Sequence, residues 1–147
     1  MGHEVLLLDE PTAGLDPEER VRFASLLTDL AADRIVLLST HIVGDVEAVA
    51  ESLALIDGGR LVCHQEPNDL LSAVTGCVWT WTVPNDRVAA VKSRWQVTAS
   101  LRQSDGVQLR IVADRAPDAQ ARPATPSLLD AYLARLISER ETTEGEQ

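Results

Sequence analysis

The sequence predicts an α/β protein in which a parallel sheet with flanking helices is followed by a small α+β subdomain. Two apolar runs, at residues 5–8 and 35–38, are short and unbroken rather than alternating. Runs of this kind are typical of strands that are buried on both faces of a parallel sheet. A helical pattern separates them, and farther along the chain strand and turn patterns alternate with shorter helical ones. These observations indicate a βαβ unit first and a smaller, separate sheet later.

The segment between the two apolar runs predicts a helix with a defined start. Asp16 is the expected N-cap, Pro17 takes the first helical position and Glu19 can complete a capping box. The apolar residues recur at helical spacing, as Phe23, Leu26, Leu27, Leu30 and Ala31. Because such crossovers are right-handed in nearly every case, we expect the two strands to run parallel, as neighbours or with another strand between them. Their carboxyl ends then open on the same edge of the sheet.

A second helix and a hairpin are expected after the second strand. The helix has an apolar stripe that consists of Ile42, Val46, Val49, Ala50 and Leu53. Two short strands, at 53–57 and 60–64, then flank a Gly58-Gly59 turn, which is a β-hairpin signal.

We place a domain boundary near Gly76, after a short helical segment at 68–74. Residues 1–75 then form the first domain and residues 76–114 a small α+β subdomain. The subdomain is expected to contain a strand at 77–83, a helix at 86–94, and strands at 95–103 and 107–113 that are antiparallel across a Ser104-Asp105-Gly106 turn. The remaining expected segments are a proline- and alanine-rich linker at 115–126, an amphipathic helix at 127–140 and a disordered tail at 141–147.

Composition limits the classes of function. The 147 residues carry a formal net charge of −10, and Lys92 is the single lysine. A surface that binds the phosphate backbone of nucleic acids needs clustered positive charge, so we expect no nucleic-acid partner. The aliphatic runs are too short for a transmembrane segment and no signal peptide is evident, so we expect a cytoplasmic protein. Cys63 and Cys77 lack metal-ligand spacing and are expected to be reduced thiols.

Polar side chains follow both strands of the predicted parallel pair. Asp9 and Glu10 end the first strand, and Ser39-Thr40-His41 end the second. Ligands of open α/β sheets bind outside the carboxyl ends of the strands, so these residues are the first candidates for a site. Two carboxylates suit phosphoryl transfer, since one can hold Mg²⁺ while the other orients or deprotonates the attacking water. A histidine at the neighbouring strand end can reach a phosphate oxygen.

Each of these residues also has an ordinary structural interpretation. An aspartate after an apolar strand often begins a turn, and Asp16 lies within a complete helix-start signal. His41 can be a helix-start or packing residue, and Ser39-Thr40 can cap the next helix. For Asp16 both interpretations can hold.

The motifs taken together resemble the ATPase domain of the ATP-binding cassette (ABC) family. VLLLDE is similar to the Walker B strand with its catalytic glutamate, AGLD to the D-loop and STH to the switch-histidine loop. The resemblance implies part of a P-loop NTPase sheet, with ATP and Mg²⁺ as cofactors. It implies that Asp9 holds Mg²⁺ through water, that Glu10 polarises the attacking water and that His41 contacts the γ-phosphate. It also places four D-loop residues at a dimer interface: Ala13, Gly14, Leu15 and Asp16.

The resemblance is strong over residues 4–64 and looser over 65–140. In the second stretch, VWTWTV and TPSLLDAYLARL resemble the C-terminal extension of bacterial ABC exporter ATPases of the drug, antibiotic or sodium efflux kind. The family implies a second ATPase subunit and a membrane permease as partners. It also implies a position in the cytoplasm, peripheral to the inner face of the cell membrane.

Motifs that capture nucleotide in this family are missing from the 147 residues. There is no G-x-x-x-x-G-K-[ST] phosphate loop, and Lys92 follows Val91 rather than glycine. An LSGGQ-like signature is missing as well. We therefore expect the second half of an ABC ATPase, inactive alone, which arises from an internal start, a disrupted gene or a split subunit and aggregates or associates with the missing N-terminal half.

Two other functions remain open at this point. The chain can be a non-enzymatic binding or regulatory module whose C-terminal unit, with Trp79, Trp81 and Trp95, docks on a cognate ATPase or permease. It can also be an unrelated Mg²⁺-dependent phosphohydrolase that uses Asp9 and Glu10. Paired tryptophans on one strand face are more often core than contact surface, which disfavours the binding module.

Overall fold

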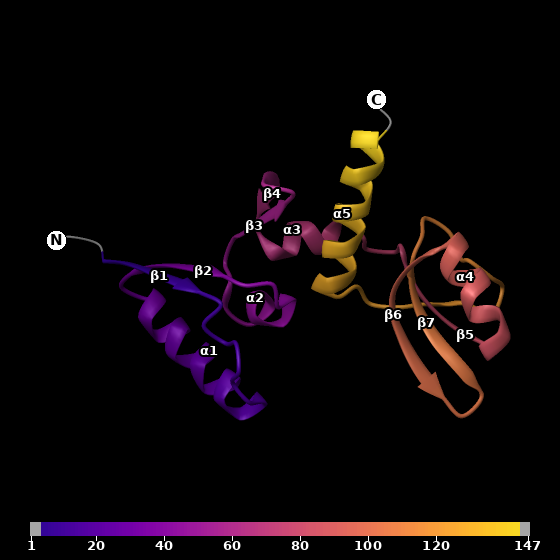
Figure 1. Ribbon diagram of the computed structural model, residues 1–147, viewed down its shortest axis with the longest axis horizontal. Coiled ribbons are helices and arrows are strands. Elements are labelled where there is room, and N and C mark those ends of the chain that lie inside the picture. The colour runs from indigo at the N-terminus through magenta and orange to yellow at the C-terminus, as the bar shows by residue number, and fades with distance from the viewer. Residues whose placement is uncertain (1–3, 145–147) are drawn as a thin grey trace. The chain divides into compact units, whose positions relative to one another are not determined.

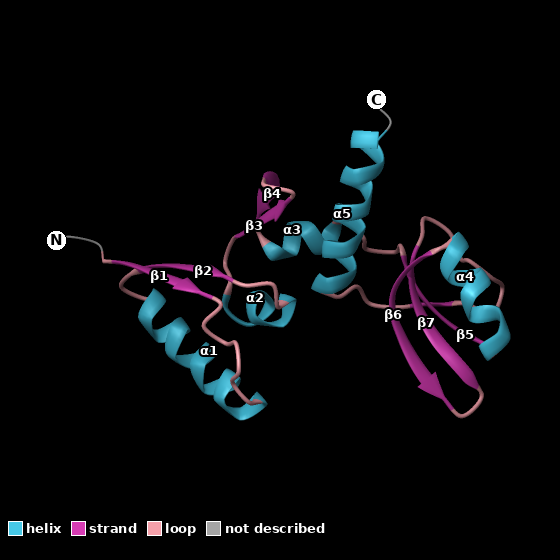
Figure 2. Ribbon diagram, viewed as in Figure 1, coloured by secondary structure: helices cyan, strands magenta, loops and turns pink. Residues whose placement is uncertain are grey.

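The computed structural model describes residues 4–144 of the chain, which divide into two compact units, Met1–Leu53 and Ala54–Gln147. Figure 1 shows the path of the chain and Figure 2 its mixed helices and strands. The mixed α/β class predicted from the sequence is confirmed. The domain boundary expected near Gly76 stays a prediction. Within residues 4–144, no helix combines the length and apolar character that crossing a membrane requires.

The first unit is a βαβ arrangement followed by a short helix. Its elements are β1 (Val5–Asp9), α1 (Pro17–Ala31), β2 (Ile35–Ser39) and α2 (Val43–Val49). The strands run parallel, as the sequence predicted, and they are direct neighbours, with Val5 opposite Ile35 and Asp9 opposite Ser39. The expected capping box is present, because Asp16 accepts from the amide of Glu19 and Glu19 accepts from the amide of Asp16, both at 2.9 Å. The helix α2 ends at Val49, earlier than its apolar stripe suggested.

One expectation about β1 and β2 is wrong. The apolar runs indicated strands buried on both faces, but alternate side chains are 58–69% exposed: Val5, Leu7, Ile35 and Leu37. The intervening side chains are half-buried. An unbroken apolar run shows only that both faces of a strand are suited to burial. Actual burial also requires other helices or strands that pack against each face. Within the described part of the first unit, no element covers the second face.

The second unit begins with a hairpin and ends with a long helix. The hairpin strands β3 (Leu53–Asp57) and β4 (Arg60–Gln65) pair across a Gly58-Gly59 turn. Both glycines have positive φ, 55° and 77°, which the tight two-residue turn requires, and the predicted hairpin is confirmed. Two helices of this unit contact each other, α3 (Pro67–Ser72) and α5 (Leu128–Glu144). Because α5 reaches Glu144, residues 141–144 are helical rather than disordered, and 145–147 lie outside the described residues.

A four-stranded antiparallel sheet forms the rest of the second unit. Its strands follow the order β6 (Gln96–Gln103), β7 (Gly106–Val112), β5 (Val78–Val83) and β8 (Arg122–Pro123). A short 3₁₀ turn, η1 (Asn85–Arg87), leads into α4 (Val88–Arg94). The register of β6 on β7 shifts between Val97 and Ala99, which marks a β-bulge. The expected linker at 115–126 is wrong in part, because Arg122 and Pro123 pair with β5.

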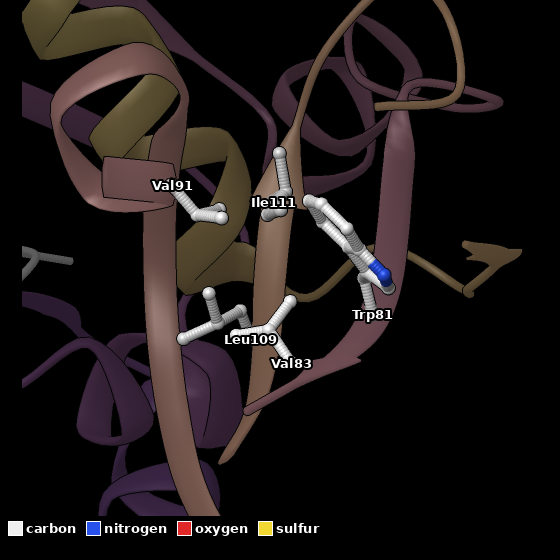
Figure 3. Close-up of a cluster of buried hydrophobic side chains, with 5 residues drawn as sticks. All are labelled: Trp81, Val83, Val91, Leu109 and Ile111. Carbon is white, nitrogen blue, oxygen red and sulfur yellow. The ribbon is translucent and has the colours of Figure 1, made fainter. Parts of the chain in front are cut away.

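The core of this sheet lies between α4 and the strands. Figure 3 shows its five buried side chains, Trp81, Val83, Val91, Leu109 and Ile111. The ring of Trp81 is therefore part of the core, as expected for a tryptophan of this strand. Gly106 is required beside it, because a Cβ at this residue would lie 2.4 Å from the carbonyl oxygen of Val83, and its φ is 148°.

A buried carboxylate anchors the start of α5 on the sheet. Asp130 is 1% exposed and pairs with the guanidinium of Arg110, whose Nε lies 3.0 and 2.8 Å from its two oxygens. Thr98 donates its hydroxyl to the same carboxylate at 2.5 Å. Ser127 donates both its amide and its hydroxyl at 2.8 Å, which completes a capping box in front of α5. The carboxylate is therefore both a helix cap and an ion-pair partner.

Candidate functional site

The carboxyl ends of β1 and β2 bring the two predicted groups of site residues together. The parallel register places Asp9 directly opposite Ser39. The hydroxyl of Ser39 donates to the carboxylate of Asp9, and the amide of Glu10 donates to the carbonyl of Ser39 at 2.9 Å. The end of β1 and the loop after it are thus tied to the end of β2, which puts Asp9, Glu10 and His41 on one edge.

Glu10 and His41 face each other across this edge. Oε2 of Glu10 lies 2.9 Å from Nδ1 of His41, a distance that becomes an ion pair when the imidazole is protonated. The same Oε2 atom is shielded from solvent and accepts no hydrogen bond of good geometry. The contact is therefore electrostatic rather than a well-aligned hydrogen bond, and this carboxylate oxygen keeps an unused acceptor. The imidazole itself is exposed.

The backbone of Glu10 has an unusual conformation. Its φ is 46°, and within the described residues it is the single non-glycine residue with a positive φ. A side chain in the left-handed region costs of order 1–3 kcal/mol, and such residues gather at functional sites where the surrounding structure enforces them. The carbonyl of Glu10 accepts from the amide of Ala13 at 3.1 Å, so the strained residue also begins the following turn. No sequence signal marked this conformation.

The predicted D-loop residues form a turn that leads into α1. Gly14 has a φ of 83°, which suits glycine, and the amide of Leu15 donates to the carbonyl of Thr12 at 3.1 Å. The carboxylate of Asp16 is engaged as the cap of α1. The structural interpretation of Asp16 is thus confirmed, while the place of Ala13, Gly14, Leu15 and Asp16 at a dimer interface stays a prediction.

Three residues behind the site, Asp45, Thr12 and Arg20, were not predicted from the sequence. Asp45, in the first turn of α2, accepts a hydrogen bond from the hydroxyl of Thr12 and lies 3.9 Å from the guanidinium of Arg20. Thr12 is 3% exposed, which is rare for a polar residue. An acidic residue in the first turn of a helix suggests a cap or a favourable dipole interaction, so the sequence alone gave no sign that Asp45 reaches β1's loop.

The donor set at the edge suits a hard metal ion only in part. Within residues 4–144, no group of three or more His, Cys, Asp or Glu side chains is placed to hold a metal ion. Mg²⁺ usually takes one or two carboxylates and completes its shell with water and phosphate oxygens. Asp9, at the end of β1, supplies a carboxylate of that kind. The residues therefore fit Mg²⁺ that arrives with a phosphate ligand.

Curated proteins match part of this chain. No family model matches the chain. Nod factor export ATP-binding protein I of Cupriavidus pinatubonensis is 37% identical over 75 residues, which are 50% of this chain and 23% of that protein. The ABC-type organic anion transporter ABCA8B of mouse is 47% identical over 60 residues, and ATP-binding cassette sub-family A member 9 of human is 45% identical over 60. These matches cover 41% of this chain and 4% of each mammalian protein.

The matched segment thus spans less than a quarter of the length of the bacterial relative. It nevertheless covers half of the chain at an identity of more than one third. The mixed α/β structure, with its parallel β1–β2 pair, is compatible with part of an ABC ATPase fold. Over half its length, this chain is homologous to the ATP-binding proteins of ABC transporters.

Proposed function

We propose that this chain supplies the hydrolytic edge of the nucleotide-binding subunit of an ABC export system. The observation that carries the proposal is the juxtaposition of Glu10 and His41, 2.9 Å apart, beside Asp9 at the ends of two parallel strands. The relatives, whose names include ATP binding and export, support it. Phosphoryl transfer needs groups that are held in place and aimed at developing charge, and the three side chains meet at one edge for that purpose.

Each residue has a distinct role in this proposal. Asp9 holds Mg²⁺ through water, and the metal, when bound, neutralises charge on the phosphate oxygens. Glu10 orients and polarises the attacking water with the carboxylate oxygen that accepts no hydrogen bond within the chain. His41, whose ring is exposed, contacts the γ-phosphate. The strained backbone of Glu10 fixes its carboxylate toward His41 before nucleotide binds.

The proposal includes a requirement for a second polypeptide segment. The 147 residues contain no G-x-x-x-x-G-K-[ST] loop, whose backbone amides and lysine cradle phosphates. We therefore propose that the chain alone does not hydrolyse ATP and that a phosphate loop in another segment completes the site. In the assembled system the D-loop faces a second ATPase subunit, and a membrane permease holds the complex at the cytoplasmic face of the membrane.

The proposal is tested by complementation. The chain is assayed for MgATP hydrolysis alone and after mixing with a polypeptide that carries the phosphate loop and signature of a related ATP-binding protein. We expect turnover only in the mixture, and we expect Glu10→Gln to lower kcat by about 100-fold or more. Glu47→Gln, an exposed substitution on α2, is the matched control and leaves kcat unchanged.

Three results would contradict the proposal. Turnover by the chain alone that disappears in Glu10→Gln would remove the requirement for a phosphate loop. Turnover in the mixture that is the same for Glu10→Gln and Glu47→Gln would remove the hydrolytic role of Glu10. Hydrolysis of other phosphoesters without ATP would instead favour a phosphohydrolase.

A further inference from the structure

A single carboxylate links the two loops of the candidate site. Oδ2 of Asp45 accepts from the hydroxyl of Thr12, in the loop after β1, and lies 3.4 Å from the hydroxyl of Thr40, in the loop after β2. Thr12 follows Glu10 by two residues, and Thr40 directly precedes His41. Each hydroxyl thus belongs to the same loop as one of the two facing site groups.

The chemistry of Asp45 indicates a specific role rather than a surface charge. Its side chain is 11% exposed, so the charge must be compensated by hydrogen bonds and by a cation. Arg20 provides the cation, with its Nη1 3.9 Å from Oδ1 of Asp45, while its Nε donates to the carbonyl of Leu15 at 3.4 Å. The carboxylate therefore holds the loop after β1 at two points, Thr12 directly and Leu15 through Arg20.

Asp45 does not cap its own helix, which is one usual role of an acidic residue in the first turn of a helix. The residue before α2 is Ile42, and α2 has no side-chain cap. The amide of Ile42 donates instead to the hydroxyl oxygen of Thr40 at 3.0 Å, so Thr40 accepts from its own loop while it donates to Asp45. The hydroxyl partners of the Asp45 carboxylate thus lie outside its own helix: Thr12 is 33 residues away in sequence, and Thr40 precedes α2.

We propose that Asp45 is a positioning residue that holds Glu10 and His41 opposite each other by fixing the loops after β1 and β2 to one carboxylate. The proposal rests on the proposed function only in that Glu10 and His41 are the reacting groups. Loss of the carboxylate leaves two threonine hydroxyls and one guanidinium without their common partner. Both loops are then released together, although only one side chain has changed.

The experiment follows amide hydrogen exchange by NMR in the full chain without nucleotide. The amides of Ala13 and Leu15 report the loop after β1, and the amide of Ile42 reports the loop after β2. We expect Asp45→Ala to speed exchange about tenfold at all three amides, the loss expected for about one hydrogen bond to a charged group. The amide of Ile35, which donates to Glu4 in the sheet, is the reference and stays unchanged.

Two variants separate positioning from a general loss of stability. Asp45→Asn keeps the shape and one oxygen acceptor, and we expect it to restore slow exchange in both loops. Leu27→Ala removes a buried side chain of α1 and is the matched control. We expect the control to speed exchange at Ile35 as much as in the loops, because it lowers the stability of the whole unit.

A third variant tests the coupling between the loops. Thr12→Val removes the hydroxyl in the first loop, and Asp45 is the group that connects this hydroxyl to Thr40. We expect Thr12→Val to speed exchange at Ile42, in the second loop. At one fixed pH, the ring ¹⁵N shifts of His41 in Asp45→Ala are expected to move toward those of Glu10→Gln, because both changes remove the Glu10 contact.

The proposal is overturned if Asp45→Ala changes the three loop amides no more than the reference, or if it gives the same pattern as Leu27→Ala. It is also overturned if Thr12→Val leaves Ile42 unaffected. Should Asp45→Ala fail to fold, Asp45→Asn and Thr12→Val decide the question. Because no nucleotide is used, these outcomes do not depend on the complementation assay, so either conclusion can fail without the other.

Discussion

Removal of the Asp130 carboxylate tests how the second unit is held together. Asp130→Ala leaves the guanidinium of Arg110 without its partner and takes away the cap in front of α5. Breaking a buried ion pair costs about 3–5 kcal/mol. The side chain of Arg110 is 26% exposed, so water can replace part of the lost interaction and the lower end, about 3 kcal/mol, is expected.

Urea unfolding followed by tryptophan fluorescence measures this loss directly. The three tryptophans lie in or beside the sheet that Asp130 contacts, and Trp81 belongs to its core. With an m-value of about 1–3 kcal/mol per molar urea, a loss of about 3 kcal/mol lowers the urea concentration at the unfolding midpoint by about 1–3 M. The matched control is Asp105→Ala, in an exposed turn of the same sheet, which is expected to stay within about 0.5 kcal/mol of the unchanged chain. Equal midpoints for Asp130→Ala and Asp105→Ala would refute the reasoning.

The pH dependence of the same carboxylate has a definite sign. Burial alone would raise the pKa of Asp130, but hydrogen bonds from Arg110, Thr98 and Ser127 outweigh burial and hold the pKa below its usual value. A carboxyl with a lower pKa in the folded state adds stability above its unfolded pKa of about 3.9, and that stability is lost as the pH falls through the folded pKa. The difference between the unchanged chain and Asp130→Ala is therefore expected to shrink below about pH 4. A difference that stays constant from pH 7 to pH 3 would contradict this.

Three further substitutions are expected to differ in their effect on stability: one lowers it, one raises it and one leaves it almost unchanged. Gly106→Ala places a Cβ 2.4 Å from the carbonyl oxygen of Val83 and is expected to lower stability by about 1–3 kcal/mol in thermal unfolding followed by circular dichroism. Gly44→Ala, in α2 with no atom within 4 Å of its Cβ, is expected to raise it by up to about 1 kcal/mol in the same measurement. Asp57→Asn removes an exposed ion pair in which a hydrogen bond from Arg140 lowers the pKa of Asp57. We expect almost no change in the free energy of unfolding at pH 7. The small effect of the substitution is expected to weaken further in high salt or below about pH 4.

Local signals were sufficient to predict most elements of the chain. The start of α1 was readable because Asp16, Pro17 and Glu19 act on neighbouring backbone groups. The hairpin was readable because two adjacent glycines tolerate positive φ in a tight turn. The parallel direction of β1 and β2 followed from the βαβ crossover, which left open whether the two strands are direct neighbours.

The features that the sequence did not reveal depend on distant partners. Pro123 joins the sheet through a pairing with Trp79, and two residues are too few to carry a strand pattern. The link between Thr12 and Asp45 depends on the packing of α2, not on spacing. The positive φ of Glu10 is imposed by the surrounding loops, since nothing in a glutamate favours it. The exposure of β1 and β2 depends on what packs against them rather than on their own residues.

The two edge strands of the antiparallel sheet differ in length, but both are poorly suited to pair with a strand from another chain. On one side Pro123 has no amide hydrogen to offer to an incoming strand, and β8 is only two residues long. On the other side the bulge between Val97 and Ala99 interrupts the ladder of β6. Neither edge is a flat template for another chain. Self-association by addition of a strand to this antiparallel sheet is therefore disfavoured. We expect aggregation of the protein to depend instead on the exposed aliphatic face of β1 and β2.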